Sequence, residues 1–237
     1  ALLKPENEAI GVVMLQLLIF LLPALVICRL RGNAFTARLR LRLPRPSHIL
    51  LLLSALLALI AGSLLISIQT GGIHTLDHRF SLYDTFVSQQ GDGAGDVVQL
   101  VLAYAVMPAV CEEFLFRGVL CAELEHRGLL CAVTFNALYF GMLHFQLQQL
   151  PVYMFAGVLL CLVLYATRSL PAAMLLHFAY NLFGLFGQPA LTQFYQYTGS
   201  TALFTFLLTV ILLLSAVLFC GEAGRIYRGY ARASVST

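Results

Sequence analysis

The sequence predicts an all-α protein, a polytopic bundle of about seven transmembrane helices. Its 237 residues are 60% hydrophobic and only 11% charged, whereas a soluble globular domain carries about 25% charged residues. The mean hydropathy is +0.87, and several apolar stretches reach the roughly 17 to 25 residues that cross a bilayer as a helix. Membrane lipids are therefore the first expected partners, and no nucleic-acid partner is expected.

Seven apolar stretches are candidates for membrane-spanning helices. Polar or turn-forming residues separate them: Gly128 follows His126 and Arg127 after the third stretch, and Ser169 with Pro171 caps and starts the sixth. No internal repeat or low-complexity segment interrupts the series. The predicted spans are 10–28, 49–68, 97–121, 128–145, 150–167, 170–187 and 202–220.

The 14 Lys and Arg residues predict the orientation of these helices. Cytoplasmic loops of membrane proteins carry an excess of Lys and Arg, so we place the arginine-rich loop 29–48 inside. Alternation then leaves only Lys4 and Arg79 outside and Arg117 within a span. The N-terminus is therefore expected outside and the C-terminus in the cytoplasm. The residues expected inside are Arg29, Arg31, Arg38, Arg40, Arg42, Arg45, Arg127, Arg168, Arg225, Arg228 and Arg232.

Several other features are weak signals of chemistry. The six cysteines form no CxxC pair, so we interpret them as buried small apolar residues rather than as disulfides or zinc ligands. His74, Asp77 and His78 have metal-ligand spacing in HTLDHRF, but they lie in a polar outside loop, which favours a solvated segment on the membrane surface. Gly157 and Gly184 are expected to be close-packing points between helices.

Three ionisable residues interrupt the third predicted span, in the stretch CEEFLFRG (111–118). A charge inside a bilayer is costly and marks a functional site by default; the alternative is an ion pair that only fixes helix packing. Glu113 and Arg117 are four residues apart with the acid first, which favours a pair on one helix. Glu112 points about 100° away and has no such partner, so it suits a general base. Pro108 predicts a kink just before the acids that admits water.

Two histidines and an asparagine are the polar groups that other spans bring toward these acids. His144 ends the stretch FGMLH, where Phe140 shares its helix face and is expected to wall the pocket. His177 and Asn181 lie one turn apart in HFAYN. A rise of about 1.5 Å per residue places Glu112, His144 and His177 about 19, 24 and 12 Å above the inner ends of their helices. A lone histidine in an apolar helix is more often a packing residue, but this combination favours a catalytic site at mid-membrane.

These residues form three short motifs in a defined order. EEFLFR (112–117), FGMLH (140–144) and HFAYN (177–181) resemble the EExxxR, FxxxH and HxxxN/D motifs of the CPBP family of CAAX proteases and bacteriocin-processing enzymes, also called the Abi family. Its members are intramembrane endopeptidases related to the CAAX prenyl endopeptidase. The resemblance covers about residues 96–187. It implies three regions: 1–95, two N-terminal helices with a basic cytoplasmic loop and a polar outside loop; 96–187, a CPBP-like catalytic core; and 188–237, a C-terminal helix with a basic tail.

The resemblance also implies a role for each motif residue. Glu112 is expected to be the general base that activates water, and His144 to help hold and polarise that water. His177 and Asn181 are expected to stabilise the oxyanion of the tetrahedral intermediate. The residues expected to brace these groups are Glu113, Arg117 and Phe140.

No cofactor is expected, and zinc is the alternative. Zinc in catalytic sites typically has three protein ligands, and the candidates here are Glu112, His144 and His177. However, the chain has no HExxH motif, and the expected pairing of Glu113 with Arg117 removes a further carboxylate. We therefore favour a metal-free, glutamate-dependent peptidase.

The sequence thus predicts an integral membrane endopeptidase that hydrolyses a peptide bond of a membrane-associated protein or peptide. The compact chain with short loops favours the bacterial cytoplasmic membrane as its location. The alternative is a non-proteolytic membrane partner or bacteriocin-immunity protein of the same fold. A proton-coupled transporter would also bury Glu, Arg and His, but no inverted repeat or pair of broken helices is found.

Overall fold

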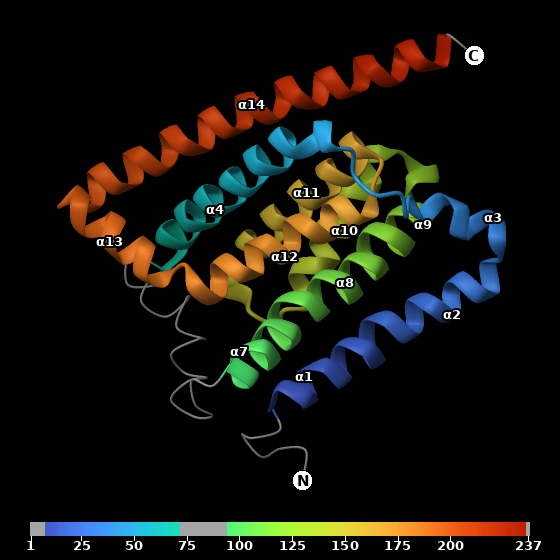
Figure 1. Cartoon of the computed structure of the whole chain (residues 1–237), viewed down its shortest axis with the longest axis horizontal. Helices are drawn as coiled ribbons and strands as arrows, with labels where there is room; N and C mark the ends of the chain where they lie inside the picture. The colour runs from blue at the N-terminus through green and yellow to red at the C-terminus, as the bar shows by residue number, and fades with distance from the viewer. Residues whose placement is uncertain (1–7, 72–93, 236–237) are drawn as a thin grey trace.

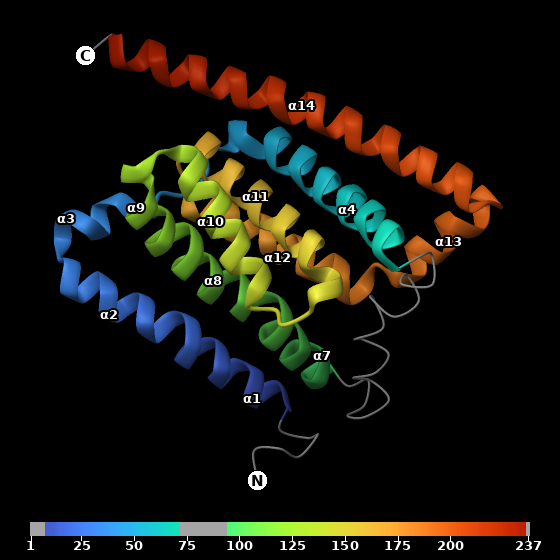
Figure 2. The same cartoon turned by 180° about the vertical axis from the view of Figure 1, so that it is seen from behind.

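The computed structural model describes residues 8–71 and 94–235, and the regular secondary structure of this part of the chain is helical. The long helices lie side by side with their axes roughly aligned and form one bundle (Figures 1 and 2). The predicted all-α, polytopic class is therefore confirmed. The segment 74–80, with its two histidines, lies outside the described residues.

The N-terminal part consists of two long helices joined by a basic linker. The first helix runs without interruption through α1 (Glu8–Leu15), a π-helical turn (Gln16–Leu21) and α2 (Leu22–Arg31). The linker contains α3 (Asn33–Thr36) and two 3-10 turns (Ala37–Leu39 and Pro46–His48), and it leads into α4 (Ile49–Gly71).

A long helix with the acidic motif follows. It comprises α7 (Ala94–Val101), a π-helical turn (Leu102–Val106), α8 (Met107–Glu113), a second π-helical turn (Phe114–Leu120), α9 (Cys121–Leu124) and a 3-10 turn (Glu125–Arg127). The remaining elements are α10 (Leu129–Met142), a 3-10 turn (Leu147–Gln149), α11 (Leu150–Thr167), α12 (Leu170–Phe186), α13 (Gln188–Thr198) and α14 (Thr201–Val235).

Each of the seven predicted spans contains a helix, but the helices differ in their ability to cross a membrane. Within the described ranges, five helices are long and apolar enough, and the bent pair α12–α13 makes a sixth if it is one span. α10 has 14 residues and is about 21 Å long, shorter than the roughly 30 Å of a hydrocarbon core. The number of crossings therefore stays a prediction. The sequence did not predict α13, because its segment QPALTQFYQYT is too polar for a span.

Contacts between separate segments gather arginines at one end of the bundle. Arg40 of the linker forms an ion pair with Glu125 at 2.8 Å, and its carbonyl accepts a hydrogen bond from the backbone N–H of Leu170, also at 2.8 Å. Arg225 of α14 donates to the carbonyl of Ser47 at 2.6 Å. The start of α1 lies at the opposite end of the bundle from the end of α14 (Figure 1). This clustering supports the expected single cytoplasmic face, while the orientation in the membrane stays a prediction.

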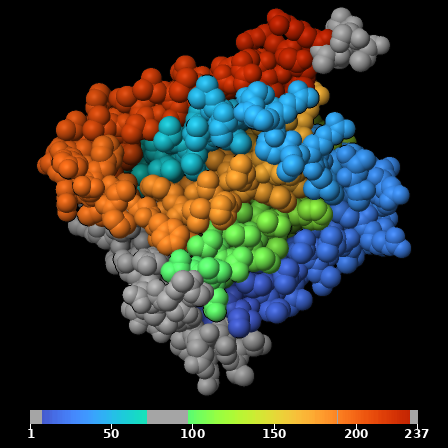
Figure 3. All heavy atoms as spheres, viewed as in Figure 1, coloured from blue at the N-terminus to red at the C-terminus, as the bar shows by residue number. Residues whose placement is uncertain are grey.

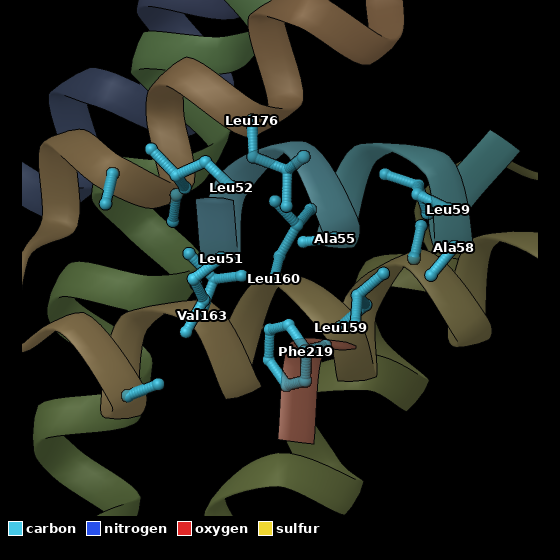
Figure 4. Close-up of a cluster of buried hydrophobic side chains, with 14 of the residues drawn as sticks. Leu51, Leu52, Ala55, Ala58, Leu59, Leu159, Leu160, Val163, Leu176 and Phe219 are labelled. Atoms are coloured by element: carbon cyan, nitrogen blue, oxygen red, sulfur yellow. The ribbon is translucent and has the colours of Figure 1, made fainter. Parts of the chain in front are cut away.

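The main hydrophobic core lies between α4, α11, α12 and α14 (Figure 4). Large side chains interlock there with alanines, so that these helices pack closely. The labelled residues are Leu51, Leu52, Ala55, Ala58, Leu59, Leu159, Leu160, Val163, Leu176 and Phe219.

Two predictions about small residues are only partly right. Gly157 is a close-packing point, because a Cβ atom there would lie 2.8 Å from the Cα atom of Ala137. The same prediction for Gly184 is wrong: within the described chain, nothing lies within 4 Å of such a Cβ atom. The cysteines are free thiols, but Cys220 on α14 is exposed and Cys131 is half-buried, so they are not all buried as predicted.

Candidate active site

The acidic motif lies on a helix that continues through Pro108 instead of breaking there. A π-helical turn, Leu102–Val106, directly precedes α8, and Pro108 lies near the start of α8. A second π-helical turn, Phe114–Leu120, begins after Glu113. π-helical turns are rare in proteins, and those that occur are often found at functional sites. Two widened turns therefore flank α8, and both acids lie at the end of this short α-helical stretch.

Glu113 and Arg117 form the predicted ion pair. Arg117 Nη1 donates to Glu113 Oε1 at 2.8 Å, and both side chains are fully buried. The Arg117 Nη2 atom also donates to the carbonyl of Gly157 at 3.2 Å. Its guanidinium lies 4.3 Å from the centre of the Phe140 ring, a cation–π contact. Arg117 therefore ties α11 and α10 to the acidic helix.

His177 contacts Glu113, the acid that also pairs with Arg117. Its Nδ1 atom lies 2.8 Å from Glu113 Oε1, across 64 residues of sequence. An ionised carboxylate only accepts hydrogen bonds, so Nδ1 carries the hydrogen. The side chain of Ser169 caps α12 as predicted, by accepting a hydrogen bond from the backbone N–H of Ala172. This cap starts the helix that places His177 beside the acids.

Glu112 has no partner on its own helix, as predicted, but it does have one on the first helix. Gln16 Nε2 donates to Glu112 Oε1 at 2.8 Å, and the Glu112 side chain is buried. Sequence reasoning missed Gln16. The available signal was its chemistry, because a carboxamide within an apolar span is a candidate functional group in the same way as a charge.

His144 lies just beyond the end of α10, with its ring held on two sides. Its Nδ1 atom is 2.8 Å from the carbonyl oxygen of Phe140, so Nδ1 donates. The ring stacks on that of Tyr153, with centroids 3.7 Å apart and planes 19° apart. Tyr153 is a second site residue that the sequence did not single out.

Phe140 lies between the two histidines, as expected of a pocket wall. Its ring contacts His144 edge-on at 4.9 Å and His177 edge-on at 5.9 Å between centroids. Asn181 is half-buried, one turn beyond His177 on α12. Its side chain makes no hydrogen bond to any described residue. The structure therefore brings the acids and both histidines together and leaves the Asn181 carboxamide available.

The alternative zinc site is not preformed among the described residues. No group of three His, Cys, Asp or Glu side chains in the described ranges is placed to hold a metal ion. The Nδ1 atoms of His144 and His177 are engaged by a carbonyl and a carboxylate, an arrangement that is also typical of histidines that bind a metal through Nε2. The metal-free site with Glu112 as general base therefore stays a prediction.

Fold and site together define a helical membrane protein with a buried Glu–Arg–His network and a second carboxylate beside it. Residues 94–183 match the family model described as type II CAAX prenyl endopeptidase Rce1-like, and this range contains all three motifs. The chain therefore contains a region similar to the Rce1-like family, in agreement with the resemblance of its three motifs to the CPBP family of CAAX proteases. No curated protein and no solved structure matches the chain. The family supports an intramembrane CAAX-type protease as the kind of function.

Proposed function

We propose that the protein is an intramembrane endopeptidase of the bacterial cytoplasmic membrane in which Glu112 activates the attacking water. This proposal rests on the different hydrogen-bond partners of the two acids. Glu113 accepts hydrogen bonds from Arg117 and His177, whereas the described partner of Glu112 is the neutral amide of Gln16. A carboxylate that no cation neutralises keeps its ability to accept a proton, as a general base must.

The proposed reaction is hydrolysis of a peptide bond of a membrane-associated protein or peptide. Water transfers a proton to Glu112 as its oxygen bonds to the carbonyl carbon, and the electron pair of the C=O double bond moves to the carbonyl oxygen. Collapse of this tetrahedral oxyanion breaks the C–N bond. The proton on Glu112 passes to the leaving amine, so that one peptide and one water yield a carboxylic acid and an amine.

His177 is suited to stabilise the oxyanion because of its contact with Glu113. Since Nδ1 donates to that carboxylate, Nε2 donates to the oxyanion only when the ring is protonated. A ring that carries hydrogen on both nitrogens would donate from Nδ1 to Glu113 and from Nε2 to the oxyanion. Asn181, on the same helix face, offers amide N–H groups as further donors.

His144 is suited to hold the attacking water. Its Nδ1 atom donates to the Phe140 carbonyl, so in the neutral ring Nε2 is the acceptor. An acceptor at Nε2 receives a hydrogen bond from water, and stacking on Tyr153 limits rotation of the ring. His144 and Glu112 thus act together on one water molecule.

The substitution Glu112→Gln tests the proposal because it removes the proton acceptor and preserves the size of the side chain. Membranes containing the parent protein are compared with Glu112→Gln membranes by mass spectrometry of released peptides and new termini. We expect a set of cleavage products that the variant does not produce. The rate is expected to fall by at least about 100-fold, the lower end of the contribution of a positioned general base.

Glu123→Gln is the matched control. Glu123 lies on the same helix and contacts Arg31 at the exposed end of the bundle, where ion pairs contribute about 0–1 kcal/mol. Its variant should retain the full cleavage set at equal expression. If Glu112→Gln membranes retain that set, or if the parent produces no such set, the protease proposal is wrong and the non-proteolytic partner or immunity role takes its place.

A further inference from the structure

The first helix supplies a direct contact to the proposed catalytic base. Gln16 Nε2 donates to Glu112 Oε1 at 2.8 Å, from 96 positions earlier in the chain. Gln16 lies outside residues 94–183, which match the Rce1-like family model. The three sequence motifs therefore assign it no role.

Gln16 is a polar exception in the middle of an apolar stretch. Within residues 10–28, Gln16 is the only side chain with an amide, carboxylate or basic group. Its Oε1 atom is buried and has no hydrogen-bond partner among the described residues. An unpaired buried carbonyl is unfavourable, and an apolar side chain of equal length would avoid that penalty. The contact with Glu112 is the interaction that offsets it.

The first helix is otherwise held loosely along one side of the molecule, next to α8 (Figure 3). Only 6% of its apolar window is buried, compared with 56% for the helix Pro46–Gly71. Near its start, Tyr104 donates to Glu8 at 2.9 Å, and farther along, the ring of Phe20 lies 6.3 Å from that of Phe116. Gln16 lies between these two contacts, so they fix its height opposite Glu112.

The type of donor matches the requirements of a base. An amide N–H holds one carboxylate oxygen in a fixed direction without the positive charge that Arg117 brings to Glu113. Glu112 Oε2 makes no hydrogen bond to the described part of the chain, which leaves it for water. The neutral amide thus orients Glu112 through one carboxylate oxygen and leaves the other oxygen for water.

We propose that Gln16 is a positioning residue for Glu112, so that the N-terminal helix completes the active site of the Rce1-like domain. Gln16 orients the carboxylate and does not itself touch the reacting atoms. This inference rests on the proposed role of Glu112 as general base.

The test measures kcat and KM separately for purified full-length protein. The probe is an internally quenched peptide copied from a site that parent membranes cleave and Glu112→Gln membranes leave intact. For Gln16→Met, which has nearly the same length but no N–H, we expect kcat to fall about tenfold, as the loss of one hydrogen bond to a charged group implies. KM should stay within about twofold, because no substrate contact is removed. The unfolding temperature should stay within about 4 °C of the parent value.

Two further variants distinguish the positioning of Glu112 by Gln16 from the docking of the first helix against the rest of the bundle. Gln16→Asn keeps the amide but is one methylene too short, so we expect the same loss of kcat even if the Met variant folds poorly. Phe20→Leu weakens packing one turn farther along the helix and should keep kcat within about twofold, because it does not touch Glu112.

The outcomes distinguish this inference from the proposed function. If both Gln16 variants keep full kcat while Glu112→Gln is inactive, Glu112 is still the base and the role of Gln16 is wrong. If Phe20→Leu loses kcat together with Gln16→Met, the first helix acts through docking and the inference is also wrong. If Glu112→Gln still cleaves the probe, both proposals are wrong.

Discussion

At the scale of single residues, buried charges converge on one atom, Glu113 Oε1. Arg117 and His177 each donate to it at 2.8 Å. Moving a carboxylate and a guanidinium out of water costs several kcal/mol per ion, which is recovered only with good geometry and additional hydrogen bonds. Arg117 gains these from the Gly157 carbonyl and the Phe140 ring. Glu113 thus connects Arg117 and His177, and Glu112 is left for the proposed role of general base.

The placement of the acidic and imidazole side chains also leads to a prediction about metal. Because no group of three His, Cys, Asp or Glu side chains in the described ranges is placed to hold a metal ion, we expect active protein to contain far less than one zinc per chain. Elemental mass spectrometry of purified, cleavage-competent protein measures this, and a chelator should leave the cleavage rate unchanged. Zinc that approaches one ion per chain and is lost together with activity would contradict the metal-free mechanism.

At the scale of elements, the packing of α10 against α11 sets the position of Arg117 and Phe140. Gly157 of α11 lies against the backbone of Ala137 on α10, and its carbonyl accepts a hydrogen bond from Arg117. Small residues at such interfaces let helix backbones approach closely. The close approach brings the Gly157 carbonyl to the guanidinium and the Phe140 ring to both histidines.

Gly157→Ala should therefore destabilise the protein. Its Cβ would lie 2.8 Å from the Ala137 Cα and 3.1 Å from its Cβ, and backbone atoms cannot move aside as a flexible side-chain end can. We expect a loss of about 1–3 kcal/mol, as for other overpacked sites, together with reduced cleavage. Denaturant unfolding in detergent measures the stability.

Gly184→Ala is the matched control on α12. Within the described chain, nothing lies within 4 Å of a Cβ atom there, so the change should be neutral or stabilising by up to about 1 kcal/mol through helix propensity. Equal losses of stability for the two variants would show that close packing at Gly157 is not the cause.

At the scale of the whole molecule, the ends of the bundle differ in charge. Arginines from the linker and from α14 meet at one end, where they contact Glu125 and backbone carbonyls. The start of α1 lies at the other end (Figures 1 and 2). The outer helices expose many large apolar side chains. Such a surface is compatible with contact to the hydrocarbon of a lipid bilayer. The arginine-rich end is the expected cytoplasmic face.

This arrangement predicts an odd number of crossings with the N-terminus outside. A C-terminal green fluorescent protein fusion should fluoresce, and a C-terminal alkaline phosphatase fusion should be inactive. An N-terminal epitope tag should be removed by protease added to intact spheroplasts. If the tag is protected while the C-terminus is cytoplasmic, the number of crossings is even and the predicted orientation of the first helix is wrong.

The sequence predicted those parts of the site that depend on local spacing. The Glu113–Arg117 pair follows from a four-residue separation on one helix, and the Ser169 cap follows from a serine directly before a proline-containing first turn. Phe140 and His144, four residues apart, are in ring contact, although His144 lies just beyond the end of α10. The π-helical turn before Pro108 was not predicted, because local sequence rules do not include such a response to packing.

By itself, then, the sequence determined the membrane-bundle class, the helical segments, the order of the three motifs and the local ion pair, because hydropathy and helical periodicity act over a few turns. Only the tertiary structure decided which acid receives His177 and that Gln16 reaches Glu112, across 64 and 96 residues. The physical reason is that these contacts depend on how helices are tilted and rotated against one another. That geometry is set by packing such as Gly157 against Ala137, which no single helix encodes.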